Sequence, residues 1–169
     1  MSEKPTRPPE DEKRKHRCAF TGHRPQYLRR PEDDVKVDLE NAIMAAVHDG
    51  LTTFITGGAY GVDIWAAEIV MRLQQNNKDL HLIAAIPYPG FECRWTDEWK
   101  TRYKAVLAAA DYVVFMEPEY SREAYQIRNE WMVSHASRLI AVYNGEKSGT
   151  RNTIHYAKRI SVNVKTIKG

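Results

Sequence analysis

The sequence is poor in cysteine, with only Cys18 and Cys93 among 169 residues. Two thiols are too few for a disulfide-stapled domain, and neither has the spacing of a zinc motif. The six histidines also lack an H-x-x-x-H or similar metal-binding pattern. We therefore expect reduced thiols and no metal site.

Long hydrophobic runs are missing as well. No apolar run reaches the roughly 18 residues that suggest a membrane-spanning helix, and residues 1–17 contain no hydrophobic stretch typical of a signal peptide. We therefore expect a cytoplasmic protein without a membrane partner. Hydrophobic residues make up 43% of the chain and charged residues 28%, which together with the length indicates one globular domain.

Most of the chain also lacks an excess of charge of one sign. The formal net charge is +3, but residues 1–17 contain six Lys or Arg against four Asp or Glu, which leaves 19 basic and 18 acidic residues in 18–169. Three prolines and few apolar residues predict a disordered polar tail at 1–17, followed by a single domain at 18–169. A near-neutral domain argues against a nucleic-acid partner, while the basic tail leaves such contact open.

Within the domain, short apolar runs alternate with segments of helical periodicity. The expected strands are 18–21, 51–56, 80–86, 112–116 and 139–143, with 162–167 as an edge strand. The expected helices are 35–47, a helix from Asp63, one from Thr96 or Asp97, 122–134, and one from Thr150 or Asn152. Strands without polar alternation, each followed by a helix, predict an α/β fold: a Rossmann-like, three-layer arrangement with a mainly parallel sheet.

No P-loop and no clean G-x-G-x-x-G motif is present. Three turns containing glycine nevertheless follow predicted strands: TGHRP at 21–25, TGGAYGVD at 56–63 and NGEKSGT at 144–150. Glycine lets backbone amides approach a ligand, and a helix N-terminus favours an anion. Ligands of such folds lie beyond the carboxyl ends of the strands. Any one of these turns alone is better explained as an ordinary tight connection, but the three together lead us to expect a phosphate-bearing ligand beside them.

Aromatic residues crowd the loop after the third predicted strand, at Tyr88, Phe91, Trp95 and Trp99. They are candidates for stacking on a purine base, although Trp99 also suits the buried side of a helix. Tyr60 lies within the second glycine turn and is a candidate stacking or interface residue. Exposed aromatic residues also leave a homodimer open.

Three stretches carry a resemblance to a known family. FTGHRP, ITGGAYGVDIWAAE and RNEWMVSHASRLIAVYNGEKSGTRNTIHYAKR together resemble the SLOG superfamily, specifically its YpsA-like branch of bacterial and phage proteins. The likeness runs from about residue 18 to 167. It implies a Rossmann-like fold and a nucleotide-type ligand, such as NAD or an ADP-ribose derivative, bound in a sensing or regulatory role without an assigned reaction.

Other branches of this superfamily supply two alternatives. LOG phosphoribohydrolases cleave the N-glycosidic bond of nucleoside 5′-monophosphates with a helical Arg and a G-G-x-G-T-x-x-E motif. Arg128 and the segment 148–150 resemble the Arg and the phosphate-binding part, but Thr153 stands at the position of the Glu. The oxocarbenium-like transition state needs a carboxylate, which Asp63 or Glu68 would have to supply. DprA/SMF proteins, which are associated with DNA, give the second alternative.

The candidate binding residues come from the three turns and one helix, and the sequence assigns no catalytic residue. The set is Thr21, Gly22, His23, Arg24, Thr56, Gly57, Gly58, Tyr60, Gly61, Asp63, Arg128, Ser148, Gly149 and Thr150. Arg24 is interpreted as a bidentate phosphate ligand or a surface salt-bridge partner. Asp63 is interpreted as a ribose ligand or a local helix cap, with a mixed role favoured because the resemblance places an acid beside the ligand at this position. For each of three residues there is an alternative to a ligand contact. The alternatives are that Thr56 simply ends its strand, that His23 forms a structural hydrogen bond, and that Arg128 lies on a solvated helix face.

Overall fold

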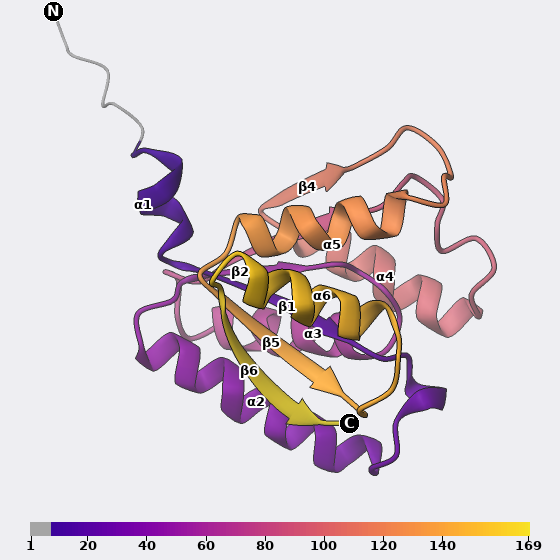
Figure 1. The fold of residues 1–169 in the computed structure, drawn as a ribbon, viewed down its shortest axis with the longest axis horizontal. Helices are drawn as coiled ribbons and strands as arrows, with labels where there is room; N and C mark the ends of the chain where they lie inside the picture. The colour runs from indigo at the N-terminus through magenta and orange to yellow at the C-terminus, as the bar shows by residue number, and fades with distance from the viewer. Residues whose placement is uncertain (1–7) are drawn as a thin grey trace, which may run out of the picture.

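The computed structural model describes residues 8–169. Helices and strands alternate along almost the whole of this range (Figure 1). The elements are α1 Glu10–Arg14, β1 Arg17–Gly22, η1 Pro25–Tyr27, α2 Glu32–His48, β2 Thr53–Thr56, α3 Val62–Gln74, β3 His81–Ile86, α4 Asp97–Ala109, β4 Tyr112–Phe115, α5 Ala124–Ser134, β5 Arg138–Tyr143, α6 Gly149–Arg159 and β6 Asn163–Lys168.

The six strands form one parallel sheet in the order β4-β3-β2-β1-β5-β6. Helices α5 and α6 cover one face, and α2, α3 and α4 cover the other (Figure 1). The expected Rossmann-like, three-layer fold is confirmed, and the sheet is wholly rather than mainly parallel.

Side chains on successive strand residues enter two separate cores, because neighbouring residues of a strand point to opposite faces of the sheet. Phe20 and Phe54 pack with α2, α3 and α4, and their rings stack at 5.9 Å. Ala19 and Ile55 belong to the second core, which they form with residues of α5 and α6. Burial on both faces explains why these strands are apolar without alternation.

The segment expected as a disordered tail differs from the prediction where it is described. Residues 1–7 lie outside the described residues. Residues 10–14 form α1, and Arg17 already belongs to β1, where it pairs with Thr53 of β2. One local and one long-range contact hold this segment: Arg17 forms an ion pair with Glu10, and Arg14 Nε donates to the Ala136 carbonyl at 3.0 Å. The composition of this segment predicted disorder because it does not disclose the contact between Arg14 and Ala136, which are far apart in the sequence.

Strand order places the three glycine turns at adjacent positions. The chain moves outward from β1 through β2, β3 and β4, then returns to the opposite side of β1 with β5 and β6. β1 therefore lies between β2 and β5, and the carboxyl ends of these three strands are neighbours. In open parallel sheets this reversal of direction is where ligands bind. No helix in residues 8–169 has the length and apolar character needed to cross a lipid bilayer.

Candidate functional site

The three glycine turns surround one cavity of about 330 Å³, which we call the turn cavity. Residues after β1, residues at the start of α3, the first residues of α6 and part of α5 contribute to it. Its lining residues are Phe20, Thr21, Gly22, His23, Arg24, Tyr27, Ala59, Asp63, Tyr125, Arg128, Asn129, Ser148, Gly149 and Thr150. Most of the predicted binding residues therefore come together at this cavity.

The N-terminus of α6 faces the turn cavity. Ser148 caps this helix, because its Oγ accepts from the Arg151 amide at 3.2 Å. The next two amides, of Gly149 and Thr150, donate to no other described residue. Free amides and the positive end of the helix dipole together favour an anion at this point.

Arg128 of α5 is 6% exposed and lines the same cavity. Its Nη1 donates to the Gly57 carbonyl, and its Nε donates to Asn129 Oδ1 at 2.8 Å. Burial lowers the pKa of Arg128, while the nearby Asp63 acts in the opposite direction. The alternative of a solvated helix face is therefore wrong for this side chain.

Arg24, from the turn after β1, lies beside Tyr60. Its guanidinium carbon is 4.5 Å from the centre of the Tyr60 ring, and its Nη1 is 3.4 Å from the tyrosine hydroxyl. Within residues 8–169, neither Arg24 nor Arg128 forms a salt bridge with a carboxylate. The surface salt bridge considered for Arg24 is therefore not formed, and both guanidinium groups retain hydrogen-bonding capacity for an anion.

Asp63, near the start of α3, is the acidic residue of the turn cavity. It is 7% exposed, and its Oδ2 accepts from the Ala59 amide at 3.3 Å. Burial raises the pKa of Asp63 to about 6, against the opposing effects of Arg128 and the Ala59 hydrogen bond. The carboxyl group thus holds its own turn in place and also borders the cavity.

Several predicted residues of the second turn lie behind the cavity rather than on its wall. The Thr56 hydroxyl donates to the Asp63 carbonyl at 2.8 Å and accepts from the Gly58 amide at 3.2 Å, so this group serves the turn itself. Gly58 and Gly61 have φ values of +70° and +96°, which few residues other than glycine adopt. None of these three lines the turn cavity. The expectation that the glycine run itself faces the phosphate is not supported.

Gly57 shapes the site through its missing side chain. A Cβ placed there would lie 2.7 Å from Asp63 Oδ2 and 2.8 Å from Arg128 Nη1. Gly57 therefore leaves room for a carboxyl and a guanidinium group on the same side of the turn. Gly22 has a comparable role, because a Cβ there would lie 2.5 Å from Val62 Cγ1 and would push α3 away from β1.

His23 connects the first and third turns. Its Nε2 accepts from the Asn144 amide at 3.1 Å, and its ring stacks on Tyr143 with centroids 5.9 Å apart. Burial lowers the pKa of His23. The structural hydrogen bond anticipated as one alternative for His23 is present, and the ring also borders the turn cavity.

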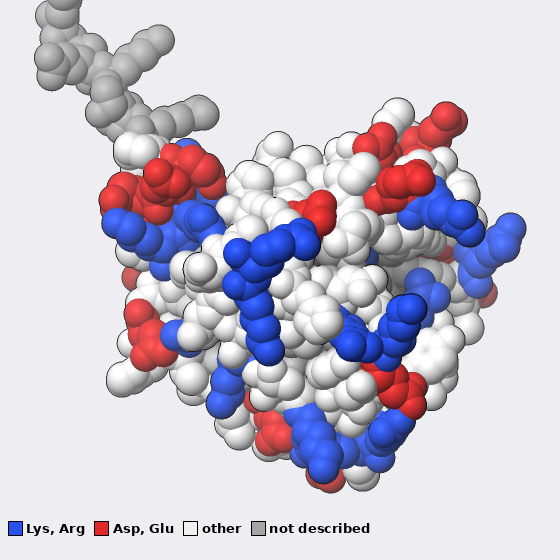
Figure 2. Space-filling view, in the orientation of Figure 1, with Lys and Arg blue, Asp and Glu red and all other residues white. Residues whose placement is uncertain are grey.

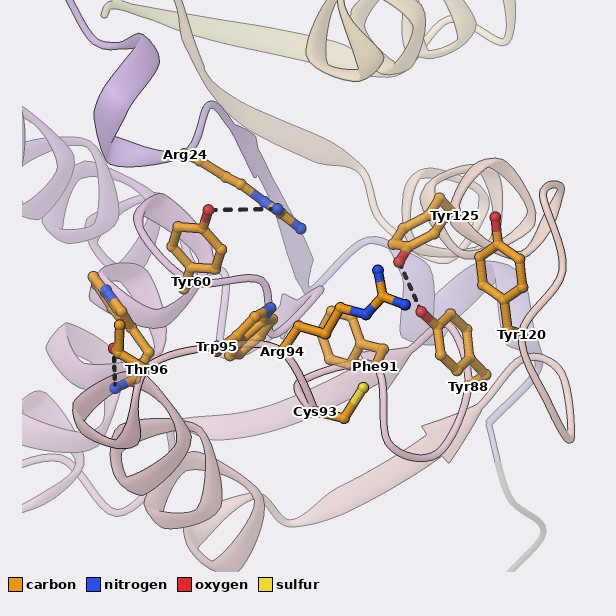
Figure 3. Close-up of a pocket in the computed structure, with 11 residues that line it drawn as sticks. Arg24, Tyr60, Tyr88, Phe91, Cys93, Arg94, Trp95, Thr96, Tyr120 and Tyr125 are labelled. Atoms are coloured by element: carbon orange, nitrogen blue, oxygen red, sulfur yellow. Dashed lines mark hydrogen bonds between the residues drawn. The ribbon is translucent and has the colours of Figure 1, made fainter.

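A second, larger cavity of about 800 Å³ adjoins the first, and we call it the aromatic cavity (Figure 3). Arg24 and Tyr125 line both cavities. The other lining residues are Tyr60, Tyr88, Phe91, Cys93, Arg94, Trp95, Thr96, Trp99 and Tyr120. The sequence singled out the ring-bearing residues of the loop after β3, but not Tyr120 or Tyr125, which approach from a different loop and from α5.

The acids considered for catalysis have distinct environments. Thr153, at the position of the LOG glutamate, donates its hydroxyl to the Gly149 carbonyl at 2.8 Å. Glu68 is held by Arg102 through two hydrogen bonds of 2.7 and 2.9 Å, and it does not line the turn cavity. Asp63 is thus the carboxyl group at this cavity. Among residues 8–169, no three His, Cys, Asp or Glu side chains gather as a potential metal site.

Comparisons with known proteins identify relatives over nearly the whole domain. The sequence profile of the YspA SLOG family (YpsA) matches residues 18–167. The SPbeta prophage-derived protein YoqJ of Bacillus subtilis is 33% identical over 138 residues, covering 72% of this chain and 81% of YoqJ. A UPF0398 protein of Bacillus cereus is 31% identical over 140 residues, covering 78% of this chain and 76% of that protein.

Two solved structures of DNA processing protein A (DprA) have a similar fold. The Helicobacter pylori protein, described with its single-stranded DNA binding mode, gives a TM-score of 0.66 at 17% identity over 95% of this chain and 68% of that one. The Streptococcus pneumoniae protein gives 0.68 at 19% identity over 94% of this chain. This chain spans about half of the S. pneumoniae protein, at 52%. At these identities the likeness concerns the fold alone.

Proposed function

Because the chain belongs to the YspA SLOG family, we propose that it binds a phosphate-bearing nucleotide or a derivative such as NAD or an ADP-ribose relative, in a sensing or regulatory role. The observation that carries this proposal is the convergence of Arg24, Arg128 and the free amides of Gly149 and Thr150 on one cavity. Each of these groups donates hydrogen bonds, and together they offset the negative charge of a phosphate.

The turn cavity suits a phosphate group of a larger ligand. Its volume of about 330 Å³ lies at the lower end of the range for ligand cavities. Within residues 8–169 neither arginine forms a salt bridge, and Asp63, the one carboxyl group lining the cavity, can offset only one of the two positive charges. The remaining positive charge at this partly buried site favours an anion bound beside the two guanidinium groups.

A thermal-shift series with AMP, ADP-ribose and NAD tests the proposal. A ligand at 100 times its dissociation constant adds about 2.7 kcal/mol of stability. Arg128→Lys keeps the charge but loses the planar fork, so we expect a loss of more than tenfold in affinity. Arg138→Lys is the matched control, because Arg138 pairs with Asp49 and lies outside the turn cavity. Absence of any shift with all three ligands would count against the proposal.

Hydrolysis of an N-glycosidic bond is a second candidate, favoured by the position of Asp63 beside Arg128 at the turn cavity. An ionised Asp63 would stabilise an oxocarbenium-like transition state in place of the missing glutamate. Chromatographic detection of adenine released from AMP tests this activity. It should disappear in Asp63→Asn, and a wild-type protein that binds AMP without releasing adenine would leave only the binding function.

Binding of single-stranded DNA is a third candidate, favoured by the fold shared with the H. pylori protein. The charge distribution argues against it. Figure 2 shows Lys and Arg interspersed with Asp and Glu over the face bearing α5 and α6, without a continuous basic stripe. Fluorescence anisotropy with an oligonucleotide decides the matter, because a DNA-binding protein would show affinity that falls steeply as salt is raised.

A further inference from the structure

The aromatic cavity carries an inference that rests on the proposed function and extends it. We propose that this cavity is the base-binding compartment of the site: it takes the planar heteroaromatic base of a nucleotide whose phosphate lies in the turn cavity. Arg24 and Tyr125 line both cavities, so one ligand can occupy the two together. The large volume, about 800 Å³, accommodates a base with its sugar.

The rings that line this cavity meet through an edge and a face or at a tilt, and guanidinium groups lie over two of them, Arg24 over Tyr60 and Arg102 over Trp99. Seven aromatic side chains line it, and every contact between two of them is edge-to-face or tilted, with interplanar angles from 43° to 90°. No two lining rings are stacked in parallel. A planar base is the kind of ligand that fills such a space by stacking on a ring face.

The rings of the cavity come from three parts of the chain: Tyr60 from the turn before α3, Tyr88 and Trp95 from the loop between β3 and α4, and Tyr120 and Tyr125 from the β4–α5 loop and α5. Figure 3 shows Tyr60 and Trp95 on one side and Tyr88, Tyr120 and Tyr125 on the other, with Arg94 between them. The hydroxyl groups of Tyr88 and Tyr125 are 2.9 Å apart and form a polar edge at the boundary with the turn cavity.

Charge and polarity make a base a better occupant than an aliphatic chain. Two guanidinium groups, of Arg24 and Arg94, line the cavity, and their planes can stack on a base as the rings do. Arg24 already lies over the Tyr60 ring at 4.5 Å, so it can bond a phosphate on one side while remaining beside the base on the other. Tyrosine hydroxyl groups and Thr96 supply hydrogen bonds for the ring nitrogens and exocyclic groups of a base.

Two probes that differ only by the base, AMP and ribose 5-phosphate, test the assignment by calorimetric titration. We expect the wild-type protein to bind AMP at least about tenfold more tightly than ribose 5-phosphate, because stacking of the base on an aromatic side chain adds binding free energy. Trp95→Leu and Tyr120→Ala should each weaken AMP binding several-fold and leave ribose 5-phosphate unchanged. Tyr120 is 67% exposed, so its truncation does not endanger folding. Tyr112→Ala, at an exposed tyrosine outside the cavity, should change neither affinity.

Tryptophan fluorescence gives a second readout, because a base stacked beside Trp95 quenches its emission and ribose 5-phosphate does not. Equal affinity for the two probes in the wild-type protein, or equal weakening of both by Trp95→Leu and Tyr120→Ala, would overturn the base-binding assignment while the phosphate site stands. Failure of both probes to bind the wild-type protein, with no thermal shift from ADP-ribose or NAD either, would instead overturn the proposed function, and the base-binding assignment with it.

Discussion

At the scale of single residues, the site depends on space left by glycine as much as on charged groups. Gly57 has no unusual φ, yet a Cβ there would intrude between Asp63 and Arg128 at distances of 2.7 and 2.8 Å. The sequence marked this glycine as a phosphate-facing amide. Its actual constraint comes from Asp63 at the end of the same turn and from Arg128 of α5, and no local pattern discloses the position of Arg128.

Gly57→Ala should therefore weaken nucleotide binding by more than tenfold and destabilise the fold by about 1 to 3 kcal/mol, the usual range for overpacking. Urea unfolding and calorimetric titration measure the two effects. Gly149→Ala is the control for stability, because no atom lies within 4 Å of a Cβ placed there. A Gly57→Ala variant with wild-type stability and affinity would refute this role.

Asp63 stabilises the fold at low pH rather than at neutral pH, which is the reverse of the usual effect of a carboxyl group. The folded state holds its proton more tightly than the unfolded state, because burial raises the pKa from 3.8 to about 6. The stabilising contribution is complete below pH 3.8 and is lost as the pH rises through about 6. Asp63→Asn should thus be more stable than the wild type by about 2 to 3 kcal/mol at pH 7 and equally stable near pH 4.

Urea unfolding of both proteins from pH 4 to pH 7 checks this expectation. Asn retains an acceptor for the Ala59 amide, so the comparison isolates the charge. A variant less stable than the wild type at pH 7 would mean that the ionised carboxylate stabilises the fold. A gain in stability would fit a residue kept for binding or catalysis at the expense of stability.

At the scale of elements, the start of α6 combines a helix cap with an anion site. Ser148 caps the helix and also lines the turn cavity. Ser148→Asp should preserve the cap and the stability, since Asp is as good a cap and suits the helix dipole. It should nevertheless lower nucleotide affinity at least tenfold, because its carboxylate takes the position of the anion.

Ser148→Asn supplies the neutral control, which should retain both the cap and the binding. Thermal unfolding and titration with AMP distinguish the two properties. If Ser148→Asp bound AMP as tightly as the wild type, the phosphate would lie elsewhere.

The types and order of the helices and strands were predictable because each has a characteristic local spacing of apolar residues. Leu80–Ile86 and Leu139–Tyr143 are apolar runs of strand length, and the structure has β3 and β5 there. The helix α1 was not predictable from composition, since the hydrogen bond from Arg14 to the Ala136 carbonyl joins residues far apart in the sequence. The position of Tyr120 and Tyr125 beside Tyr88 likewise depends on how loops from different strands meet.

At the scale of the whole molecule, the two edges of the sheet differ. The edge strand β6 carries two lysines, a device that discourages pairing with another sheet. The other edge, β4, is Tyr-Val-Val-Phe without a charge, and its Tyr112 and Phe115 are 55% and 44% exposed. If the chain forms the homodimer that its exposed aromatic residues suggest, β4 is the expected interface.

Sedimentation equilibrium over a range of protein concentrations tests this interface. The wild type should associate into dimers, and Phe115→Lys should shift the equilibrium to monomer without altering AMP affinity, since Phe115 lines neither cavity. A wild-type protein that stays monomeric at all concentrations would remove the dimer, and a dimeric Phe115→Lys variant would place the interface elsewhere.

The central claim is that the turns after β1 and β5, together with α5, bring Arg24, the start of α6 and Arg128 together around one phosphate. A crystal structure of the protein grown with AMP tests it most directly. The account predicts phosphate density within hydrogen-bonding distance of both guanidinium groups and of the Gly149 and Thr150 amides. A nucleotide bound at another surface, with only water in the turn cavity, would contradict it.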